Sequence, residues 1–147
     1  MNTPLIRSGM QLHSTSLLDD DPHFSGTNIL ITACDEQGAF GFVTNKPFHR
    51  RFNELEEFKY CPAFPLYIGG PVDQEHIYFI HKRSDLISGG TFIQDGLYLG
   101  GDFKQAVAAM LNNTLTASDI QLFLGYCGWD KGELEAEMEE GSWRFNL

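Results

Sequence analysis

Two glycine-containing segments hold the residues whose types and spacing best suit ligand binding. Gly69, Gly70 and Pro71 directly follow an apolar segment, and glycines at such a turn let backbone amides approach an anion. No Lys-Ser or Lys-Thr pair follows them, as it does in a phosphate-binding loop. A tight turn that redirects the sheet is therefore the simpler interpretation of the same residues.

The second segment, 125–129, is Gly-Tyr-Cys-Gly-Trp and lies between a predicted strand and a predicted helix. Sites of α/β proteins often open at such junctions, so Tyr126, Gly128 and Trp129 are candidates to line a pocket. The alternative is that the glycines only let the two aromatic rings pack on the core, which suits the large area that a tryptophan buries.

Asn45 lies between a predicted strand and Pro47, and its amide can both donate and accept hydrogen bonds, as a ligand-orienting group must. The alternative is that it satisfies backbone groups of its own loop. We expect the two glycine segments to meet in one cleft, lined by Asn45, Gly69, Gly70, Pro71, Tyr126, Gly128 and Trp129.

No catalytic residue can be assigned from the sequence. Cys127 is a conceivable nucleophile, but nothing indicates a partner histidine, and a buried thiol acting as a small hydrophobic group is the simpler reading. The chain has no Gly-x-Ser-x-Gly elbow, no His-Glu-x-x-His helix and no dinucleotide fingerprint. An enzyme of unrecognised type, such as a hydrolase using Asp21 or Cys127, stays the alternative to a binding protein.

The sequence predicts no metal site and no cofactor. His76 and His81 are five positions apart on a predicted strand, so their side chains point to opposite faces. The three cysteines, Cys34, Cys61 and Cys127, are too few and too far apart for a four-thiolate site. Reduced thiols in the cytoplasm are the simpler expectation.

The charge balance excludes some partners. Twenty Asp and Glu residues against ten Lys and Arg residues give a net charge of −10, which repels nucleic-acid backbones and anionic lipids. A small basic cluster around Lys46, His49, Arg50 and Arg51 is typical of a solvated surface. The first twenty residues contain no basic region followed by an apolar one, and no apolar run approaches the ~18 residues of a membrane span, so we expect neither secretion nor membrane insertion. We therefore expect a cytoplasmic protein without direct nucleic-acid or membrane contacts.

Strands and helices alternate without a regular βαβ rhythm, which predicts one α+β domain over residues 1–147 with a mixed, mainly antiparallel sheet. The expected strands are 28–33 and 39–44, joined as a hairpin by a longer loop, then 66–68, 77–80, 91–94, 97–99 and 120–126. The dipeptide Asp95-Gly96 predicts a type I′ hairpin turn. Three capping patterns predict helices that begin after Asn53, Asp102 and Asp130.

Segments that together span nearly the whole chain carry a recognisable pattern: Asp21-Pro22, Phe24, Gly38-Ala39, Gly41, Asn45, Pro47, Gly69-Gly70-Pro71-Val72, Gly125-Tyr126, Gly128-Trp129, Leu134-Glu135, Glu137 and Trp143. In these residues the chain resembles the bacterial YqgE/AlgH family. The resemblance implies a branched, partly barrel-like sheet surrounded by helices, and it implies no established reaction. Some members are labelled transcriptional regulators, but the acidic composition argues against direct DNA binding.

The chain departs from the family pattern at Lys46, where Arg is frequent, and at Cys127, where Ala is frequent. The polar segment 13–16 also differs from the more apolar strand usual there, which leaves the extent of the first strand open. With no nucleophile and base assembled, we expect a binding or regulatory protein whose cleft takes a small ligand or a segment of a protein partner.

Overall fold

The computed structural model describes residues 5–146, and its framework is a nine-stranded sheet. Eight strands lie in the order β6-β7-β5-β8-β3-β2-β1-β9, and β4 branches from β8. All strand pairs are antiparallel except β4 with β8. The strands are β1 (Gln11–Ser14), β2 (Asn28–Asp35), β3 (Gly38–Val43), β4 (Leu66–Ile68), β5 (Val72–His81), β6 (Thr91–Gln94), β7 (Leu97–Leu99), β8 (Ile120–Asp130) and β9 (Trp143–Asn146).

The helices are few and short. They are α1 (Phe103–Leu111), α2 (Glu133–Glu139) and three 3-10 turns, η1 (Ser16–Leu18), η2 (Phe52–Glu54) and η3 (Glu56–Phe58). Within the described residues, none of these helices has the length and apolar character needed to cross a membrane. The expected α+β class and the branched, mainly antiparallel sheet are confirmed.

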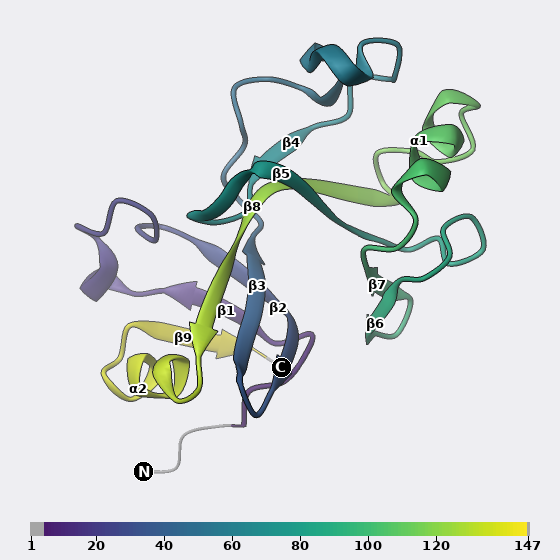
Figure 1. The fold of residues 1–147 in the computed structure, drawn as a ribbon. Helices are drawn as coiled ribbons and strands as arrows, with labels where there is room; N and C mark the ends of the chain where they lie inside the picture. The colour runs from purple at the N-terminus through teal and green to yellow at the C-terminus, as the bar shows by residue number, and fades with distance from the viewer. Residues whose placement is uncertain (1–4, 147) are drawn as a thin grey trace.

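Strand β8 is the element that joins the molecule. Its first half pairs with β4 and β5, and its second half pairs with β3. Gly125 separates the halves with a φ of +76°, a left-handed conformation that a residue with a side chain rarely adopts. Figure 1 shows β8 crossing the molecule, with α1 near its start and α2 near its end.

Three clusters of buried side chains stabilise this arrangement. One lies between α1, β4 and the 3-10 turns and includes Phe52. A second joins β1, β2, α2 and β9 and includes Trp129 and Trp143. In the third, the rings of Phe42 and Phe123 stack with centroids 4.5 Å apart. Burial on both faces of the sheet explains why β8 is apolar at consecutive positions.

The two predicted hairpins form, but their turns differ from expectation. β2 and β3 extend to Asp35 and Gly38, so the connection is shorter than the longer loop that we expected. The 95–96 turn does join β6 to β7, but only Gly96 has a positive φ, at +74°, whereas a type I′ turn needs one at Asp95 too. A register shift between Phe92 and Gln94 accommodates the difference.

The helix predicted to begin after Asn53 is wrong. The chain forms η2 and η3 instead, and no side chain caps either turn. Asn53 lies inside η2, and its Oδ1 is buried without a hydrogen-bond partner among the described residues. Packing of Phe52 into the core places the start of the turn two residues earlier than the cap pattern requires, with Arg51 instead of Asn53 at the N-cap position.

The other two capping patterns succeed to different degrees. The Asp102 carboxylate accepts a hydrogen bond from the Gln105 amide at 3.2 Å, as predicted, and α1 follows. Before α2, the N-cap residue is Gly132 with a φ of +83°, not Asp130. Strand β8 runs on to Asp130, whose amide instead donates to the Glu133 carboxylate at 2.6 Å.

The two edge strands were not located from the sequence, and β5 is longer than predicted. β9 was not predicted, and β1 was expected only from the family resemblance, with its extent left open; the two strands pair with each other over four residues at the edge of the sheet. β5 begins at Val72, five residues before its predicted start, because a register shift between Val72 and Ile77 lets it continue along β8.

Candidate functional site

A cavity of about 340 Å³ opens where the turn after β3, the bend before β5 and the loop before β2 meet. We call it the Lys46 cavity. Several of its residues belong to the segments that carry the family resemblance. Its lining is Pro22, His23, Ser25, Val43, Lys46, Ile68, Gly70, Pro71 and Gln74.

Backbone hydrogen bonds fix two walls of this cavity. The Ile68 amide donates to the Lys46 carbonyl at 2.8 Å, and the Val43 amide donates to the Gly69 carbonyl at 2.8 Å. These bonds hold the end of β3 and the turn after it against β4 and the bend that follows. The two walls therefore keep their spacing without a ligand.

Asn45 ties the third wall to the first two. Its Oδ1 accepts from the Asn28 amide at 2.8 Å, and its Nδ2 donates to the Gly26 carbonyl at 3.0 Å. The side chain thus satisfies backbone groups of the neighbouring loop, the alternative that the sequence left open. Asn45 is not among the lining residues, so it supports the loop that forms the third wall without facing the cavity itself.

The loop before β2 is held by Asp21. One carboxylate oxygen accepts from the amides of His23 at 2.8 Å and of Phe24 at 2.9 Å. The Phe24 ring then packs edge-on against Trp143, with centroids 5.7 Å apart. Asp21 therefore holds the loop that carries His23 and Ser25, and it is not itself among the lining residues of the cavity.

The glycine pair lies against the backbone of β8. A Cβ on Gly69 would lie 2.4 Å from the Gly125 carbonyl oxygen, and one on Gly70 would lie 2.2 Å from the Tyr126 carbonyl group. The Gly69 amide already donates to the Leu124 carbonyl at 2.7 Å, so it is not available to an anion. Gly70 and Pro71 nevertheless line the Lys46 cavity.

The aromatic segment faces other parts of the molecule. The Tyr126 ring stacks on Phe40, with centroids 4.5 Å apart. Trp129 is buried, donates from Nε1 to Glu137 at 3.2 Å, and lines a separate cavity of about 230 Å³. Gly128 lies between them, and a Cβ there would meet only the Tyr126 ring, at 3.4 Å. The two glycine segments thus touch along the backbone, while their side chains line different hollows.

The electrostatic feature of the Lys46 cavity is a cation without a partner. Lys46 is half-buried, and its ammonium forms no hydrogen bond or ion pair with any described residue. A Cβ on Gly26 would lie 3.8 Å from Lys46 Nζ, which places the ammonium beside the loop before β2. The Ser25 hydroxyl, also half-buried, likewise has no partner within residues 5–146.

Sequence reasoning missed most of this lining. It assigned Lys46 to a solvated basic cluster and did not consider His23, Ser25 or Gln74. One signal was available, because Lys46 stands between two residues of the family pattern, Asn45 and Pro47.

The Cys127 thiol is poorly suited to act as a nucleophile. It is one of three free cysteines in the described chain, and its side chain is almost fully buried. Burial raises the pKa of the Cys127 thiol to about 12, against a smaller opposing effect of a backbone hydrogen bond. The Sγ atom lies 3.4 Å from the Gly69 carbonyl. The thiol is therefore neutral near pH 7, which disfavours its use as a nucleophile.

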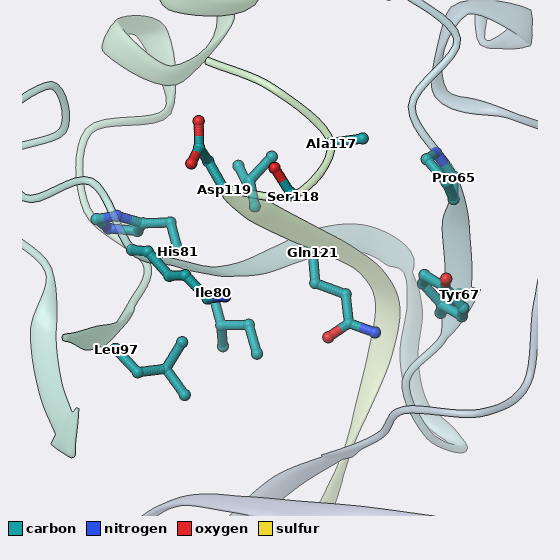
Figure 2. A pocket seen from close by; sticks show the side chains of 11 residues that line it. Pro65, Tyr67, Ile80, His81, Leu97, Ala117, Ser118, Asp119 and Gln121 are labelled. Atoms are coloured by element: carbon teal, nitrogen blue, oxygen red, sulfur yellow. The ribbon is translucent and has the colours of Figure 1, made fainter. Parts of the chain in front are cut away.

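A second cavity, of about 280 Å³, lies between β4, β5, β7 and β8 (Figure 2). Its histidine, His81, is fully engaged, because Nε2 lies 2.9 Å from the Gly100 carbonyl and Nδ1 accepts from the Arg83 amide at 3.1 Å. Burial lowers the pKa of His81. The ring is thus neutral with its proton on Nε2, and no lone pair is left for a substrate.

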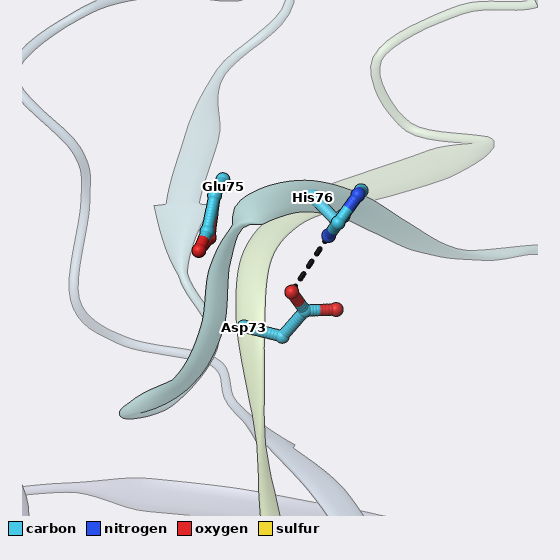
Figure 3. A group of neighbouring side chains, drawn as sticks. All are labelled: Asp73, Glu75 and His76. Carbon is cyan, nitrogen blue, oxygen red and sulfur yellow. Dashed lines mark hydrogen bonds and ion pairs between the residues drawn. The ribbon is translucent and has the colours of Figure 1, made fainter.

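Asp73, Glu75 and His76 form the one cluster in residues 5–146 whose ligand atoms lie within 4.8 Å of one another (Figure 3). His76 Nδ1 lies 2.6 Å from one Asp73 oxygen, and the Tyr78 hydroxyl donates to the other at 2.5 Å. These bonds lower the pKa of Asp73 and raise that of His76. They also raise the pKa of Tyr78 to about 12. Both Asp73 oxygens and His76 Nδ1 are thus already engaged with each other or with Tyr78.

Comparison with known proteins places the chain among uncharacterised bacterial sequences. The AlgH-like family model matches residues 12–146. A UPF0301 protein of Chlorobaculum tepidum is 40% identical over 140 residues, which cover 90% of this chain and 70% of the relative. A UPF0301 protein of Chlorobium limicola is 39% identical over 147 residues, which cover 94% of this chain and 73% of the relative.

Two solved structures share the fold. The solution structure of the AlgH protein from Pseudomonas aeruginosa has a TM-score of 0.76 and 24% identity, covering 99% of this chain and 80% of that one. A crystal structure of a protein from Corynebacterium diphtheriae also has a TM-score of 0.76 and 24% identity, covering 99% and 78%. The family match and the close relatives together show that this chain belongs to the AlgH-like family.

Proposed function

We propose that the protein is a non-enzymatic binding or regulatory protein of the cytoplasm, and that the Lys46 cavity is its binding site. The cavity takes a small ligand or a short segment of a protein partner. The observation that carries the proposal is a preformed hollow in which a half-buried lysine has no partner among the described residues.

The size and construction of the cavity support this role. A volume of about 340 Å³ lies within the range of ~300–1,000 Å³ typical of small-molecule sites. The backbone bonds from Ile68 and Val43, together with the Asn45 side chain, hold its walls in place. A preformed site loses little conformational entropy on binding, which favours affinity.

The chemistry around the cavity favours binding over catalysis. General acid–base catalysis needs a titratable group within hydrogen-bond reach of a nucleophile. Cys127 is buried with a raised pKa, and Asp21 holds two backbone amides with one carboxylate oxygen and does not line the cavity. A net charge of −10 also favours regulation through a small ligand or a protein over direct contact with DNA.

A thermal-shift screen against metabolites and short peptides tests the proposal. The informative variant is Ser25→Phe, which fills the cavity from a half-buried position, and the matched control is Ser84→Phe, at an exposed position remote from the lining. We expect a compound that raises the melting temperature of the wild type and of Ser84→Phe but not that of Ser25→Phe. If every stabilising compound acts equally on both variants, the cavity is not the binding site.

A further inference from the structure

We propose that the Lys46 cavity holds its ligand by an anionic group, a carboxylate or a phosphate, which pairs with the Lys46 ammonium and accepts a hydrogen bond from the Ser25 hydroxyl. This inference rests on the proposed function and names the ligand chemistry of the same site. Four observations on the described residues lead to it.

The first observation is that Lys46 is exceptional among the cations of this chain. Of the ten Lys and Arg side chains, all of which are described, only Lys46 and Arg83 are half-buried, and the others are exposed. Arg83 pairs with Asp85 at 2.8 Å and with Asp119 at 3.5 Å. Lys46 has no such partner in the part of the chain that the structure describes. Partial burial weakens the hydration of a charge, so an anion at this place would stabilise it.

The second observation is that the chain has many acids, yet none of the described ones pairs with Lys46. The chain has twenty Asp and Glu residues for ten Lys and Arg residues, so an internal partner would be easy to supply. None of the residues that line the Lys46 cavity is an acid, as far as the described chain goes. The nearest acid in sequence on the adjoining loop, Asp21, accepts two backbone amides instead. Residues 5–146 therefore leave the Lys46 ammonium open to an anionic ligand.

The third observation is a set of neutral donors and apolar surface around the ammonium. The Ser25 hydroxyl is half-buried and unengaged within residues 5–146. Gln74 also lines the cavity, and its Nε2 uses one hydrogen on the Gly70 carbonyl at 2.8 Å, which leaves the second free. Val43 and Ile68 supply apolar surface for the uncharged part of a ligand. A charged head and a small apolar body suit this lining.

The fourth observation is the contrast with the other hollows. The cavity near the N-terminal segment, of about 400 Å³, is lined by Asp35, Glu36 and Glu135 and by the exposed Lys131. The 280 Å³ cavity is lined by Asp119 and by the exposed Lys82. In both hollows the lining includes an acid and the lysine is exposed, whereas the Lys46 cavity combines a half-buried cation with an acid-free lining.

The same charges limit the size of the ligand. The protein as a whole carries −10, so a polyanion such as a nucleic acid is repelled over a distance of about one Debye length, ~10 Å at moderate salt. A single anionic group inside the cavity interacts mainly with the nearby ammonium. The volume of about 340 Å³ sets the same upper limit. The ligand is therefore a small monocarboxylate or monophosphate compound.

NMR titration of the ¹⁵N-labelled protein tests the inference with two probes, inorganic phosphate and propionate, at ionic strength held constant with sodium chloride. We expect saturable shifts of the amides of Ser25, Lys46 and Gly70. The relative strength of the two probes decides between a phosphate and a carboxylate. The inference is overturned if neither probe shifts these amides, or if sodium chloride alone produces the same shifts.

Three variants sharpen the titration. Lys46→Gln should weaken binding of the preferred probe about tenfold or more, the loss expected for a charge-assisted hydrogen bond. Lys46→Arg should retain binding. Lys104→Gln removes the same charge from an exposed position on α1 and should bind like the wild type. If Lys46→Gln and Lys104→Gln weaken binding equally, only the net charge matters and the site is wrong.

The outcomes separate this inference from the proposed function. Because Lys46 has no partner within residues 5–146, Lys46→Gln should melt within a degree or two of the wild type, so loss of binding cannot be ascribed to unfolding. A neutral compound that stabilises the wild type and Lys46→Gln equally, but not Ser25→Phe, would leave the binding role intact and contradict the anionic ligand. If neither anion binds and no compound in the screen stabilises the protein, both the anionic ligand and the proposed binding function are contradicted.

Discussion

Replacing Gly70 by alanine tests how β4, the bend and β8 are joined. A Cβ at this position would lie 2.2 Å from the Tyr126 carbonyl carbon and oxygen and 2.6 Å from the Cys127 nitrogen. All three atoms belong to the backbone of the central strand, so no side-chain rotation can relieve the clash. Overpacking of this kind costs about 1–3 kcal/mol, and we expect the upper end, ~3 kcal/mol, because two strands must separate.

The matched control is Gly128→Ala, three residues from Gly125 on the same strand. Gly128 is exposed, its φ is not positive, and a Cβ there meets nothing closer than 3.4 Å. We expect the free energy of unfolding of this variant to lie within ~0.5 kcal/mol of the wild type. Both substitutions add one methyl group, so their difference isolates the close approach of the backbones.

Urea unfolding followed by the fluorescence of Trp129 and Trp143 measures both variants, because both rings are buried. A loss of ~3 kcal/mol corresponds to a fall in melting temperature of about 6–12 °C for a chain of this length. If Gly70→Ala and Gly128→Ala have the same free energy of unfolding, the two backbones are not as close as described, and the explanation of the glycine pair is wrong.

Three further predictions concern stability and reactivity. Trp129→Ala should lower the free energy of unfolding by about 3 kcal/mol or more, since the ring is 7% exposed, and an unchanged melting temperature would refute this. Cys127 should resist iodoacetamide at pH 8 in the folded protein, because its pKa is about 12, and it should react in 8 M urea. Mass spectrometry measures the labelling, and rapid labelling without urea would contradict the burial of the thiol. The bond between His76 and Asp73 raises the pKa of His76 above 6.5 and lowers that of Asp73 below 3.8. Its stabilising effect should be largest between about pH 4 and 6.5, and should be lost as pH rises through the folded pKa of His76 or falls through that of Asp73. The difference in melting temperature between wild type and His76→Gln across pH measures this, and a difference that grows above pH 8 would show the assignment to be wrong.

Signals decided within a few residues were predictable from the sequence. The Asp95-Gly96 dipeptide located a hairpin because glycine accepts a positive φ at little cost. Asp102 located the start of α1 because its cap needs only the amide of Gln105. Both features depend on local chemistry.

Features that depend on distant contacts were not predictable. Asn53 has the same cap pattern as Asp102, but burial of the adjacent Phe52 determines the local backbone. β1 and β9 are each four residues long and pair with segments more than a hundred residues apart, such as Leu12 with Phe145. Strands this short carry too little periodicity to be recognised alone.

The candidate site shows the same division. The glycine bend at Gly69 and Gly70 was visible in the sequence, since glycine marks close backbone approach. The role of Lys46 was not visible in the sequence, because it depends on whether any acid of the described chain lies next to its ammonium after folding. Sequence position alone made it one of several basic residues in a loop.

The most direct measurement is a crystal structure of the protein with the compound that gives the largest thermal shift abolished by Ser25→Phe. We predict that the compound lies in the Lys46 cavity, with an anionic oxygen about 3 Å from Lys46 Nζ and within hydrogen-bond reach of the Ser25 hydroxyl. A compound that binds instead in the cavity beside His81, or that turns an uncharged face towards Lys46, would contradict the account.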